Sequence, residues 1–226
     1  MGERVALVAG AGGPLGRATV ASLAGAGFAV VAIDRTEQAM SELGDGVRRE
    51  VGDPVDPAVA KSLVDRIAAE VGVPDVLVNT IGAFRLGDTL TATPEDLSVM
   101  MDVNLGAALW LSQAVGAHMR ERGSGAIVHV SARPGLEPTA GMAAYSLSKA
   151  ALAHLTRLLD VELRPHGIRV NAVAPQLIDT PRNRAAFPPA QLTHAVAPEA
   201  IADIITFLVS DAAAPVSGAL LPAYGA

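Results

Sequence analysis

The chain has 226 residues, half of them hydrophobic, and it carries a formal net charge of −6. This length suits one α/β domain, and an acidic balance without basic runs argues against nucleic acid and anionic membrane surfaces as partners. No cysteine is present, which excludes disulfides and thiolate metal sites, and no apolar stretch approaches the roughly 20 residues that span a bilayer. We therefore expect a small-molecule partner, no metal and no membrane contact, with the cytoplasm as the simplest location because no signal peptide precedes the first strand.

Short apolar runs alternate with longer amphipathic stretches along the chain, a pattern that predicts βαβ units and a parallel sheet. The runs are continuously hydrophobic, as expected of strands that are covered on both faces. The expected strands are residues 4–10, 28–34, 47–51, 75–79, 125–131, 168–174 and 218–221. The sequence thus predicts a single doubly wound α/β domain of the Rossmann type over residues 1–226, with helices on both faces of the sheet.

A glycine-rich turn follows the first expected strand and leads into a helix. It reads Gly10-Ala11-Gly12-Gly13-Pro14-Leu15-Gly16. Glycine permits the close approach of a pyrophosphate, and a helix N-terminus supplies backbone N–H groups and a favourable dipole. Pro14 removes one donor, although its fixed φ suits the first helical turn. We expect Gly10, Gly13, Leu15 and Gly16 to contact a dinucleotide; the alternative is an ordinary strand–helix turn.

Acidic side chains follow the second and third expected strands. Asp34 ends the second strand, where a carboxylate can accept hydrogen bonds from an adenosine ribose and would repel a 2′-phosphate. Asp34 therefore makes NAD the preferred cofactor. Arg35 follows immediately and would favour the 2′-phosphate, so NADP is the alternative. Asp53 either binds adenine or begins a turn in Gly52-Asp53-Pro54.

Two long helices are expected in the second half of the chain. The first begins at Thr93-Pro94-Glu95-Asp96 and ends at Gly123. The threonine can cap the helix, the proline suits the first helical position, and the two acidic residues favour the positive end of the helix dipole. The second runs from about residue 142 to 166 and places Tyr145 and Lys149 in its first two turns. Residues four apart on a helix point the same way, and a neighbouring ammonium lowers the pKa of a tyrosine. Such a tyrosine can give a proton to a carbonyl oxygen or take one from an alcohol.

The region after the sixth expected strand, residues 175–198, is rich in proline and lacks a clear period. It is the natural candidate for a lid over a site. Arg182 and His194 lie in this segment, where they could touch substrate or simply be solvated. The apolar C-terminal segment, residues 220–224, suits either a subunit interface or packing of the last strand.

With the glycine loop, Asp34, Asn79-Thr80-Ile81-Gly82, Asn104 and the Tyr145/Lys149 pair in this order, the chain resembles the short-chain dehydrogenase/reductase family over its whole length. The resemblance implies a seven-stranded parallel sheet, an acid–base role for Tyr145, and a Lys149 that lowers the pKa of the tyrosine and binds the nicotinamide ribose. It also implies that Asn104 helps to hold a proton-relay water and that Asn79 steadies the sheet beside the cofactor. Further cofactor contacts implied are Gly82, Pro175, Ile178 and Thr180. The family's usual tetramers imply a homotetramer or dimer.

Three positions depart from the family pattern. Pro14 replaces a loop glycine, and Gln176 replaces the glycine that follows Pro175. The family's substrate-orienting serine, 13 residues before the tyrosine, is Ala132 here. Ser131 is the neighbouring hydroxyl, but adjacent strand residues point to opposite faces, so it could substitute as a catalytic group only if a bulge turned it inward. Arg133 then follows at the mouth of the site, where it could pair with substrate or form a surface salt bridge.

One branch of the family, the quinonoid dihydropteridine reductases, is similar in several of these departures. Its alanine at the serine position matches Ala132, and its L-D-T-P-x-N-R segment resembles Ile178-Asp179-Thr180-Pro181-Arg182-Asn183-Arg184. Two functional hypotheses follow. The first is an NAD(H)-dependent oxidoreductase that transfers hydride to or from a carbonyl, alcohol or quinonoid molecule. The second is a protein that keeps the fold but has lost oxidoreductase activity, and that serves as a binding, regulatory or non-redox lyase or isomerase module.

Overall fold

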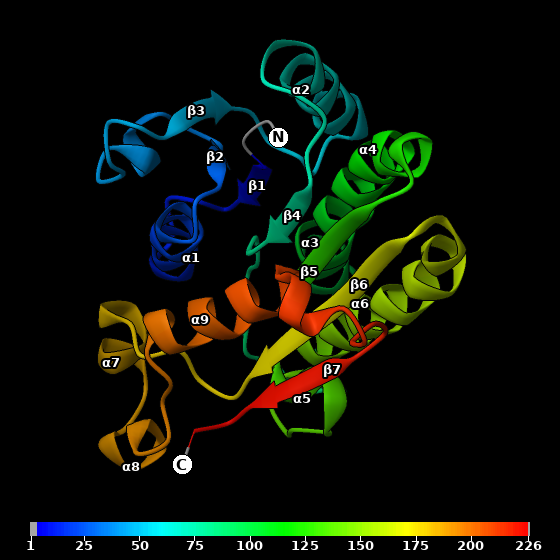
Figure 1. Ribbon diagram of the computed structural model, residues 1–226. Helices are drawn as coiled ribbons and strands as arrows, with labels where there is room; N and C mark the ends of the chain where they lie inside the picture. Colours follow the sequence, from blue (N-terminus) through cyan, green and yellow to red (C-terminus); the bar gives the residue numbers. More distant parts are fainter. Residues whose placement is uncertain (1–3, 226) are drawn as a thin grey trace.

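A computed structural model describes residues 4–225, and within them seven strands form one parallel sheet in the order β3-β2-β1-β4-β5-β6-β7 (Figure 1). The strands are β1 (Val5–Ala9), β2 (Ala29–Asp34), β3 (Arg48–Val51), β4 (Val76–Asn79), β5 (Gly125–Val130), β6 (Ile168–Pro175) and β7 (Leu220–Ala223). The predicted seven-stranded Rossmann-type fold is confirmed. Met1 to Glu3, expected just ahead of or at the first strand, lie outside the described residues.

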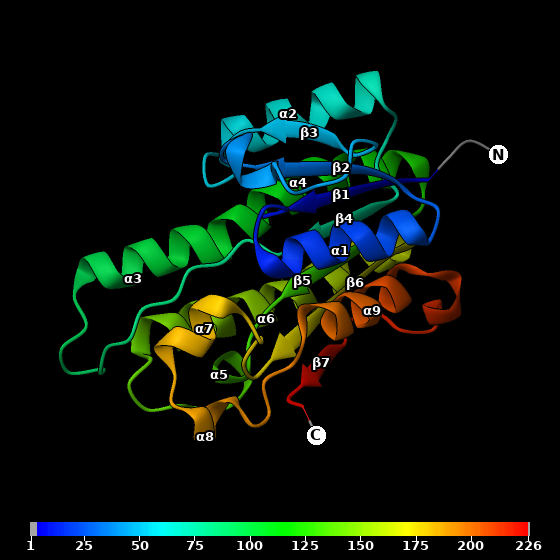
Figure 2. The same cartoon turned by 90° about the vertical axis from the view of Figure 1, so that its left-hand side faces the viewer.

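Helices cover both faces of the sheet (Figures 1 and 2). Their bounds are α1 (Pro14–Gly25), α2 (Pro57–Glu70), α3 (Pro94–Met101), α4 (Ala107–Arg122), α5 (Arg133–Leu136), α6 (Ala143–Leu163), α7 (Pro181–Ala186), α8 (Pro189–Leu192) and α9 (Pro198–Val209). Short irregular turns are η1 (Gln38–Met40), η2 (Asp102–Gly106), η3 (Arg164–His166) and η4 (Asp211–Ala213). Apolar side chains of α1 and α9 fill one core layer, and those of α2, α4 and α6 fill the other.

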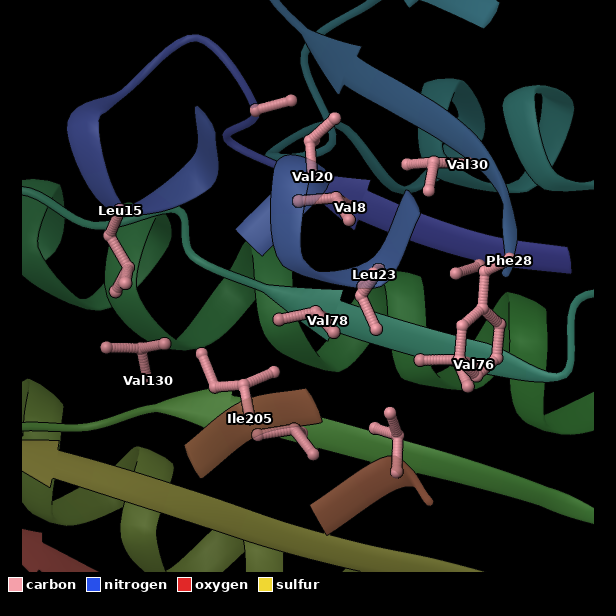
Figure 3. Close-up of a cluster of buried hydrophobic side chains, with 14 of the residues drawn as sticks. Val8, Leu15, Val20, Leu23, Phe28, Val30, Val76, Val78, Val130 and Ile205 are labelled. Atoms are coloured by element: carbon pink, nitrogen blue, oxygen red, sulfur yellow. The ribbon is translucent and has the colours of Figure 1, made fainter. Parts of the chain in front are cut away.

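Strand β1 shows why continuous hydrophobicity predicted the sheet. All five of its residues are buried, and alternate side chains enter opposite core layers: Val8 packs with α1 and α9, whereas Leu7 packs below α2 and α4. Figure 3 shows Val8 and Val78 of the sheet beside Leu23 of α1 and Ile205 of α9.

The strand order reverses at β1, which pairs with β2 on one side and β4 on the other. In doubly wound sheets the crevice at the carboxyl ends of such strands is where ligands bind. Helices α5, α7 and α8 gather at this end of the sheet (Figure 2). The fold therefore brings the glycine loop, the start of α6 and the segment after β6 to one edge.

The expected continuous helix to Gly123 is interrupted. A capping box between Thr93 and Asp96 begins α3 as predicted, but a π-helical turn, η2, separates α3 from α4. Gly123 ends α4 with φ 79°, in the left-handed region. The interruption contains Asn104, whose side chain forms hydrogen bonds to Ala83 and Ser148. Such π-helical turns occur often at functional sites.

Two other elements differ from expectation. The last strand is shifted from residues 218–221 to β7, because Gly218 adopts φ 74° in the preceding turn, where its N–H bonds to the Val170 carbonyl oxygen at 2.8 Å. The segment expected as an irregular lid, residues 175–198, contains α7 and α8, which both begin at prolines. Thr180 caps α7 by accepting a hydrogen bond from the Asn183 N–H at 3.1 Å.

Candidate active site

A cavity of about 980 Å³ opens at the carboxyl edge of the sheet, between the glycine loop and the segment after β6. Most of the predicted site residues line it together: Gly10, Gly13, Leu15, Gly16, Gly82, Ser131, Ala132, Arg133, Tyr145, Lys149, Pro175, Ile178 and Thr180. Five predicted residues do not line it: Asp34, Arg35, Asp53, Asn79 and Asn104. The glycine loop and most of the predicted nicotinamide and substrate residues thus meet around one cavity. Outside it lie the expected adenosine contacts Asp34, Arg35 and Asp53, and also Asn79 and Asn104.

The glycine loop is closed on itself by short contacts. Gly10 has φ 77°, and its carbonyl oxygen accepts a hydrogen bond from the Gly13 N–H at 3.1 Å. A Cβ atom on Gly16 would collide with that same oxygen and with the Ala11 backbone, so only glycine fits there. Pro14 is the first residue of α1, and the following first-turn N–H groups point from a helix end that favours anions. This cradle fits a pyrophosphate.

The Asp34 carboxylate is tied to the backbone at the end of β2. Its Oδ2 accepts a hydrogen bond from the Gly12 N–H at 2.9 Å, and its Oδ1 accepts one from the Arg35 N–H at 2.7 Å. A carboxylate has about four lone-pair sites, so it can still accept bonds from ribose hydroxyls. Asp53 accepts a hydrogen bond from the Val55 N–H at 3.2 Å, which is the turn expected as one of its two roles.

Asn79 and Gly82 shape the turn that follows β4. Asn79 is buried, and its Oδ1 accepts a hydrogen bond from the Ile81 N–H at 3.1 Å. Its Nδ2 has no hydrogen-bond partner within residues 4–225. A Cβ on Gly82 would lie 3.2 Å from both Asn104 Oδ1 and Lys149 Nζ. The turn therefore packs directly on the polar centre beneath the cavity.

Asn104 is fully buried and clamps three segments together. Its Nδ2 donates to the Ala83 carbonyl oxygen at 3.0 Å and to Ser148 Oγ at 2.9 Å, while its Oδ1 accepts from the Ala83 N–H at 2.9 Å. Both side-chain amide hydrogens are therefore engaged by protein groups. In this geometry the Asn104 side chain fixes the turn after β4 to α6, and the role in holding a proton-relay water that the resemblance implied stays a prediction.

Tyr145 and Lys149 occupy the first two turns of α6, as predicted, and both line the cavity. Lys149 is buried, and its Nζ donates to the Val130 carbonyl oxygen at 2.8 Å. Burial lowers the pKa of Lys149 to about 8. The Tyr145 ring packs edge-on against Phe84, with ring centroids 4.9 Å apart, and burial raises the pKa of Tyr145 to about 12. In this structure desolvation sets the direction of the Tyr145 pKa shift, and the ammonium is bonded to the end of β5, so the expected lowering of the tyrosine pKa by Lys149 stays a prediction.

The two candidates for the serine function are not equivalent in position. Ser131 is buried, and its Oγ donates to the Lys149 carbonyl oxygen at 3.0 Å, so its only proton is engaged by the backbone of α6. This arrangement does not support the expectation that Ser131 serves as a substitute catalytic hydroxyl. Ala132 lines the cavity and offers no hydrogen-bonding side chain.

Arg133 begins α5 and joins several parts of the cavity wall. Its Nε bonds to Glu137 Oε2 at 2.8 Å, its Nη1 donates to Gln176 Oε1 at 2.8 Å, and its guanidinium lies 4.8 Å from the centre of the Tyr224 ring. The salt bridge expected as one role of Arg133 is present. Its partners Gln176 and Tyr224 were not predicted, because they are distant in sequence and no spacing connects them.

Within the described residues, no group of three or more His, Asp or Glu side chains is arranged to hold a metal ion. None of the helices in residues 4–225 has the length and apolar character required to cross a membrane. On α4, His118 Nε2 lies 3.0 Å from Asp65 Oδ1 of α2.

A doubly wound parallel sheet with a glycine loop at its switch point defines the class of Rossmann-type nucleotide-binding proteins. Residues 4–191 match the family model described as short chain dehydrogenase. Galactitol 2-dehydrogenase of Rhizobium johnstonii is 37% identical over 97% of this chain and 93% of that protein. L-xylulose reductase of Mus musculus is 37% identical over 98% and 95%, respectively. The chain belongs to the short-chain dehydrogenase/reductase family, and it is an oxidoreductase of that family.

Solved structures agree with this assignment. A gluconate 5-dehydrogenase from Burkholderia cenocepacia, in complex with NADP and tartrate, has a TM-score of 0.91 at 28% identity and covers 98% of this chain and 94% of that one. The structure of ElxO with NADP bound has a TM-score of 0.90 at 22% identity, which shows likeness of fold alone.

Proposed function

We propose that this protein interconverts a secondary alcohol and a ketone of the polyol or sugar type, with a nicotinamide cofactor as hydride carrier and Tyr145 as acid–base group. The observation that carries the proposal is the single cavity that extends from the glycine loop to Tyr145 and Lys149. The names of galactitol 2-dehydrogenase and L-xylulose reductase, which match nearly the whole chain, favour hydroxylated substrates of this size. Resemblance of residues 178–184 to the quinonoid dihydropteridine reductases keeps quinonoid acceptors in the test below.

The residues present fit the cofactor. The loop of Gly10, Gly13 and Gly16 together with the start of α1 would hold the pyrophosphate, and Lys149 would hold the nicotinamide ribose. Pro175, Ile178 and Thr180 would enclose the nicotinamide from the other side. When bound, the cofactor supplies or accepts the hydride at the reacting carbon.

Tyr145 has the protonation state that ketone reduction requires. Because burial raises the pKa of Tyr145 to about 12, its phenol is protonated at neutral pH. As the carbonyl carbon gains a hydride, the carbonyl oxygen takes the Tyr145 proton, and the phenolate left beside the Lys149 ammonium is reprotonated from solvent. Burial lowers the pKa of Lys149 only to about 8, so the ammonium is still its main form at pH 7. Alcohol oxidation requires the reverse proton transfer and is favoured at high pH.

The choice between NAD and NADP depends on the end of β2. Asp34 would accept the ribose hydroxyls and repel a 2′-phosphate, which favours NAD. Arg35 and the NADP bound to the related gluconate 5-dehydrogenase favour the alternative. We propose NAD(H) as the preferred cofactor and NADP(H) as the competing one.

The proposal includes a single domain with residues 175–198 as its lid, a cytoplasmic location, and assembly into a homotetramer or dimer. Exposed apolar side chains on one face of α6 support assembly. The competing hypothesis, a family member without redox activity, rests on Ala132, because the cavity lacks the hydroxyl that usually orients the substrate.

The experiment is a titration with NADH and NADPH, followed by cofactor oxidation with xylulose, other ketoses, simple ketones, quinones and quinonoid pterins. We expect Tyr145→Phe to reduce kcat/KM by about 100-fold or more, because the proton donor is lost, while the Kd for the cofactor is retained. Full activity in Tyr145→Phe would refute the mechanism. Tight cofactor binding without turnover of any acceptor would favour the protein that has lost redox activity.

A further inference from the structure

Two departures from the family pattern lie side by side at the cavity. Ala132 follows β5, and Gln176 follows β6, which is the neighbour of β5 in the sheet. The backbone pairing continues beyond the strand, since the Ser131 N–H bonds to the Val173 carbonyl oxygen at 2.8 Å. One departure removes a hydroxyl from the cavity wall, and the other adds a carboxamide to the same wall.

The Gln176 carboxamide has a defined orientation. Its neighbour Arg133 has only N–H donors, so the amide atom that faces Arg133 Nη1 at 2.8 Å must be Oε1. The amide nitrogen, Nε2, is then the end directed away from Arg133. Within residues 4–225 this nitrogen has no hydrogen-bond partner, although Gln176 lines the cavity.

Arg133 is itself held on two further sides. Glu137 accepts from its Nε at 2.8 Å, and the Tyr224 ring lies under its guanidinium at 4.8 Å. The backbone of Gln176 is also anchored, because its N–H bonds to the Ala223 carbonyl oxygen at 3.2 Å. A side chain fixed at both its backbone and its amide oxygen loses little freedom when it donates to a ligand.

We propose that Gln176 Nε2 donates a hydrogen bond to the carbonyl oxygen of the substrate, opposite Tyr145, and so supplies the interaction that a serine at position 132 would otherwise give. Arg133 is the positioning residue that keeps the amide nitrogen toward the substrate. The inference rests on the proposed function, since it assumes a ketone or alcohol oxygen near Tyr145. It adds that this oxygen is bound by an amide donor instead of a hydroxyl.

Five variants separate this role from a structural one. Gln176→Leu removes the amide at similar volume. Gln176→Glu keeps an oxygen for Arg133 but offers the substrate an acceptor in place of a donor. Ala132→Ser restores the hydroxyl, alone and combined with Gln176→Leu. Gln113→Leu makes the same chemical change on the exposed side of α4, outside the cavity lining.

We expect kcat/KM for ketone reduction to fall about 10- to 100-fold in both Gln176→Leu and Gln176→Glu, with the Kd for NADH within about twofold of the parent. Adding Ala132→Ser to Gln176→Leu should restore at least part of that loss, and Gln113→Leu should behave as the parent. In a ¹⁵N-labelled sample with NADH or NAD, the side-chain NH₂ resonances of Gln176, assigned by their loss in Gln176→Leu, should shift when xylulose, or the ketone reduced fastest, is added.

Parent-like kcat/KM in Gln176→Leu, or unmoved Gln176 resonances in an active enzyme, would overturn the inference while leaving the proposed function intact. A matching loss of cofactor affinity or of thermal stability in Gln176→Glu would assign Gln176 to structure and also overturn it. If the parent protein turns over no acceptor with either cofactor, the proposed function fails and this inference fails with it.

Discussion

His129 is a fully buried histidine in β5 that the sequence analysis did not single out. Its Nε2 lies 3.3 Å from Ser112 Oγ, and its Nδ1 has no hydrogen-bond partner among residues 4–225. Burial, together with the charge of Lys149, lowers the pKa of His129 to about 4 from its ordinary value of 6.5. The imidazole is therefore neutral in the folded protein at pH 7, close enough to Lys149 for the lysine charge to lower its pKa.

This buried histidine predicts a pH-dependent stability. Between pH 6.5 and 4 the unfolded chain binds a proton at His129 and the folded protein does not, so the free energy of unfolding falls as the pH falls through this window. For the pKa values above, the loss between pH 7 and pH 5 is about 2 kcal/mol. Urea unfolding at the two pH values measures it.

The matched variants are His129→Asn, which removes the titrating group, and His154→Asn, which removes an exposed histidine from α6. We expect the pH 7 to pH 5 difference to shrink by about 2 kcal/mol in His129→Asn and to persist in His154→Asn. An equal pH dependence in both variants would mean that His129 is protonated in the folded protein.

Single residues also mark the limit of the sequence-based predictions for the site. Tyr145 and Lys149 were predictable because both lie on one helix at a fixed spacing. The bonds of Arg133 to Gln176 and of Asn104 to Ala83 join segments 43 and 21 residues apart, so no local pattern could predict them. The raised Tyr145 pKa depends on burial by Phe84 and the cavity wall, which is likewise a property of the folded molecule.

At the level of elements, buried parallel strands were the most predictable feature, because both faces of each strand demand apolar side chains. Three features were not predicted. The π turn η2 has a sequence compatible with an ordinary helix, and tertiary contacts of Asn104 accompany the change. The shift of β7 follows from the positive φ of Gly218, and the short helix α5 is packed so closely on α6 that a Cβ on Gly135 would lie 2.6 Å from the Lys149 carbonyl carbon.

The junction of β1 and α1 gives a prediction about the glycine loop. Gly16→Ala would bring a Cβ into the Gly10 carbonyl oxygen and the Ala11 backbone, so the loop must open. We expect a loss of about 1–3 kcal/mol in the free energy of unfolding and at least about tenfold weaker NADH binding. Chemical denaturation and a fluorescence titration with NADH measure the two effects.

The control lies on the same helix. Gly25 is the last residue of α1, and an added Cβ there would meet no atom within 4 Å. We expect Gly25→Ala to bind NADH normally and to be as stable as the parent or more stable by up to about 1 kcal/mol. If Gly16→Ala bound NADH as tightly as Gly25→Ala does, the loop would not be the pyrophosphate site.

At the scale of the whole molecule, α6 has two faces that carry apolar side chains, one buried against the sheet and one exposed. Its inner face packs Leu152, Leu155 and Leu159 against the sheet. Its outer face exposes Leu147, Leu158 and Val161, at 58%, 47% and 69% of their surface. Spacings of eleven and three positions place these residues on one side of the helix, where the exposed His154 lies between Leu147 and Leu158, and we call this side of α6 the stripe. Large apolar side chains that gather on an exposed surface can mark an interaction site.

A second copy of this chain is the occupant that we propose for the stripe, since a two-fold axis would pair α6 with its own copy and bury the same residues twice. The position of the stripe also has a functional consequence. Because α6 carries Tyr145 and Lys149 at its first turns, an interface along its outer face would restrain the helix that holds the proposed catalytic pair. Light scattering coupled to gel filtration should give a dimer or tetramer at micromolar concentration.

Leu158→Glu should lower the mass and reduce turnover, because it places a charge in the paired surface. Leu90→Glu alters a residue that is 98% exposed outside α6, so it should leave the mass unchanged. A parent protein that is monomeric at this concentration, or equal masses for Leu158→Glu and the parent, would refute assembly through α6.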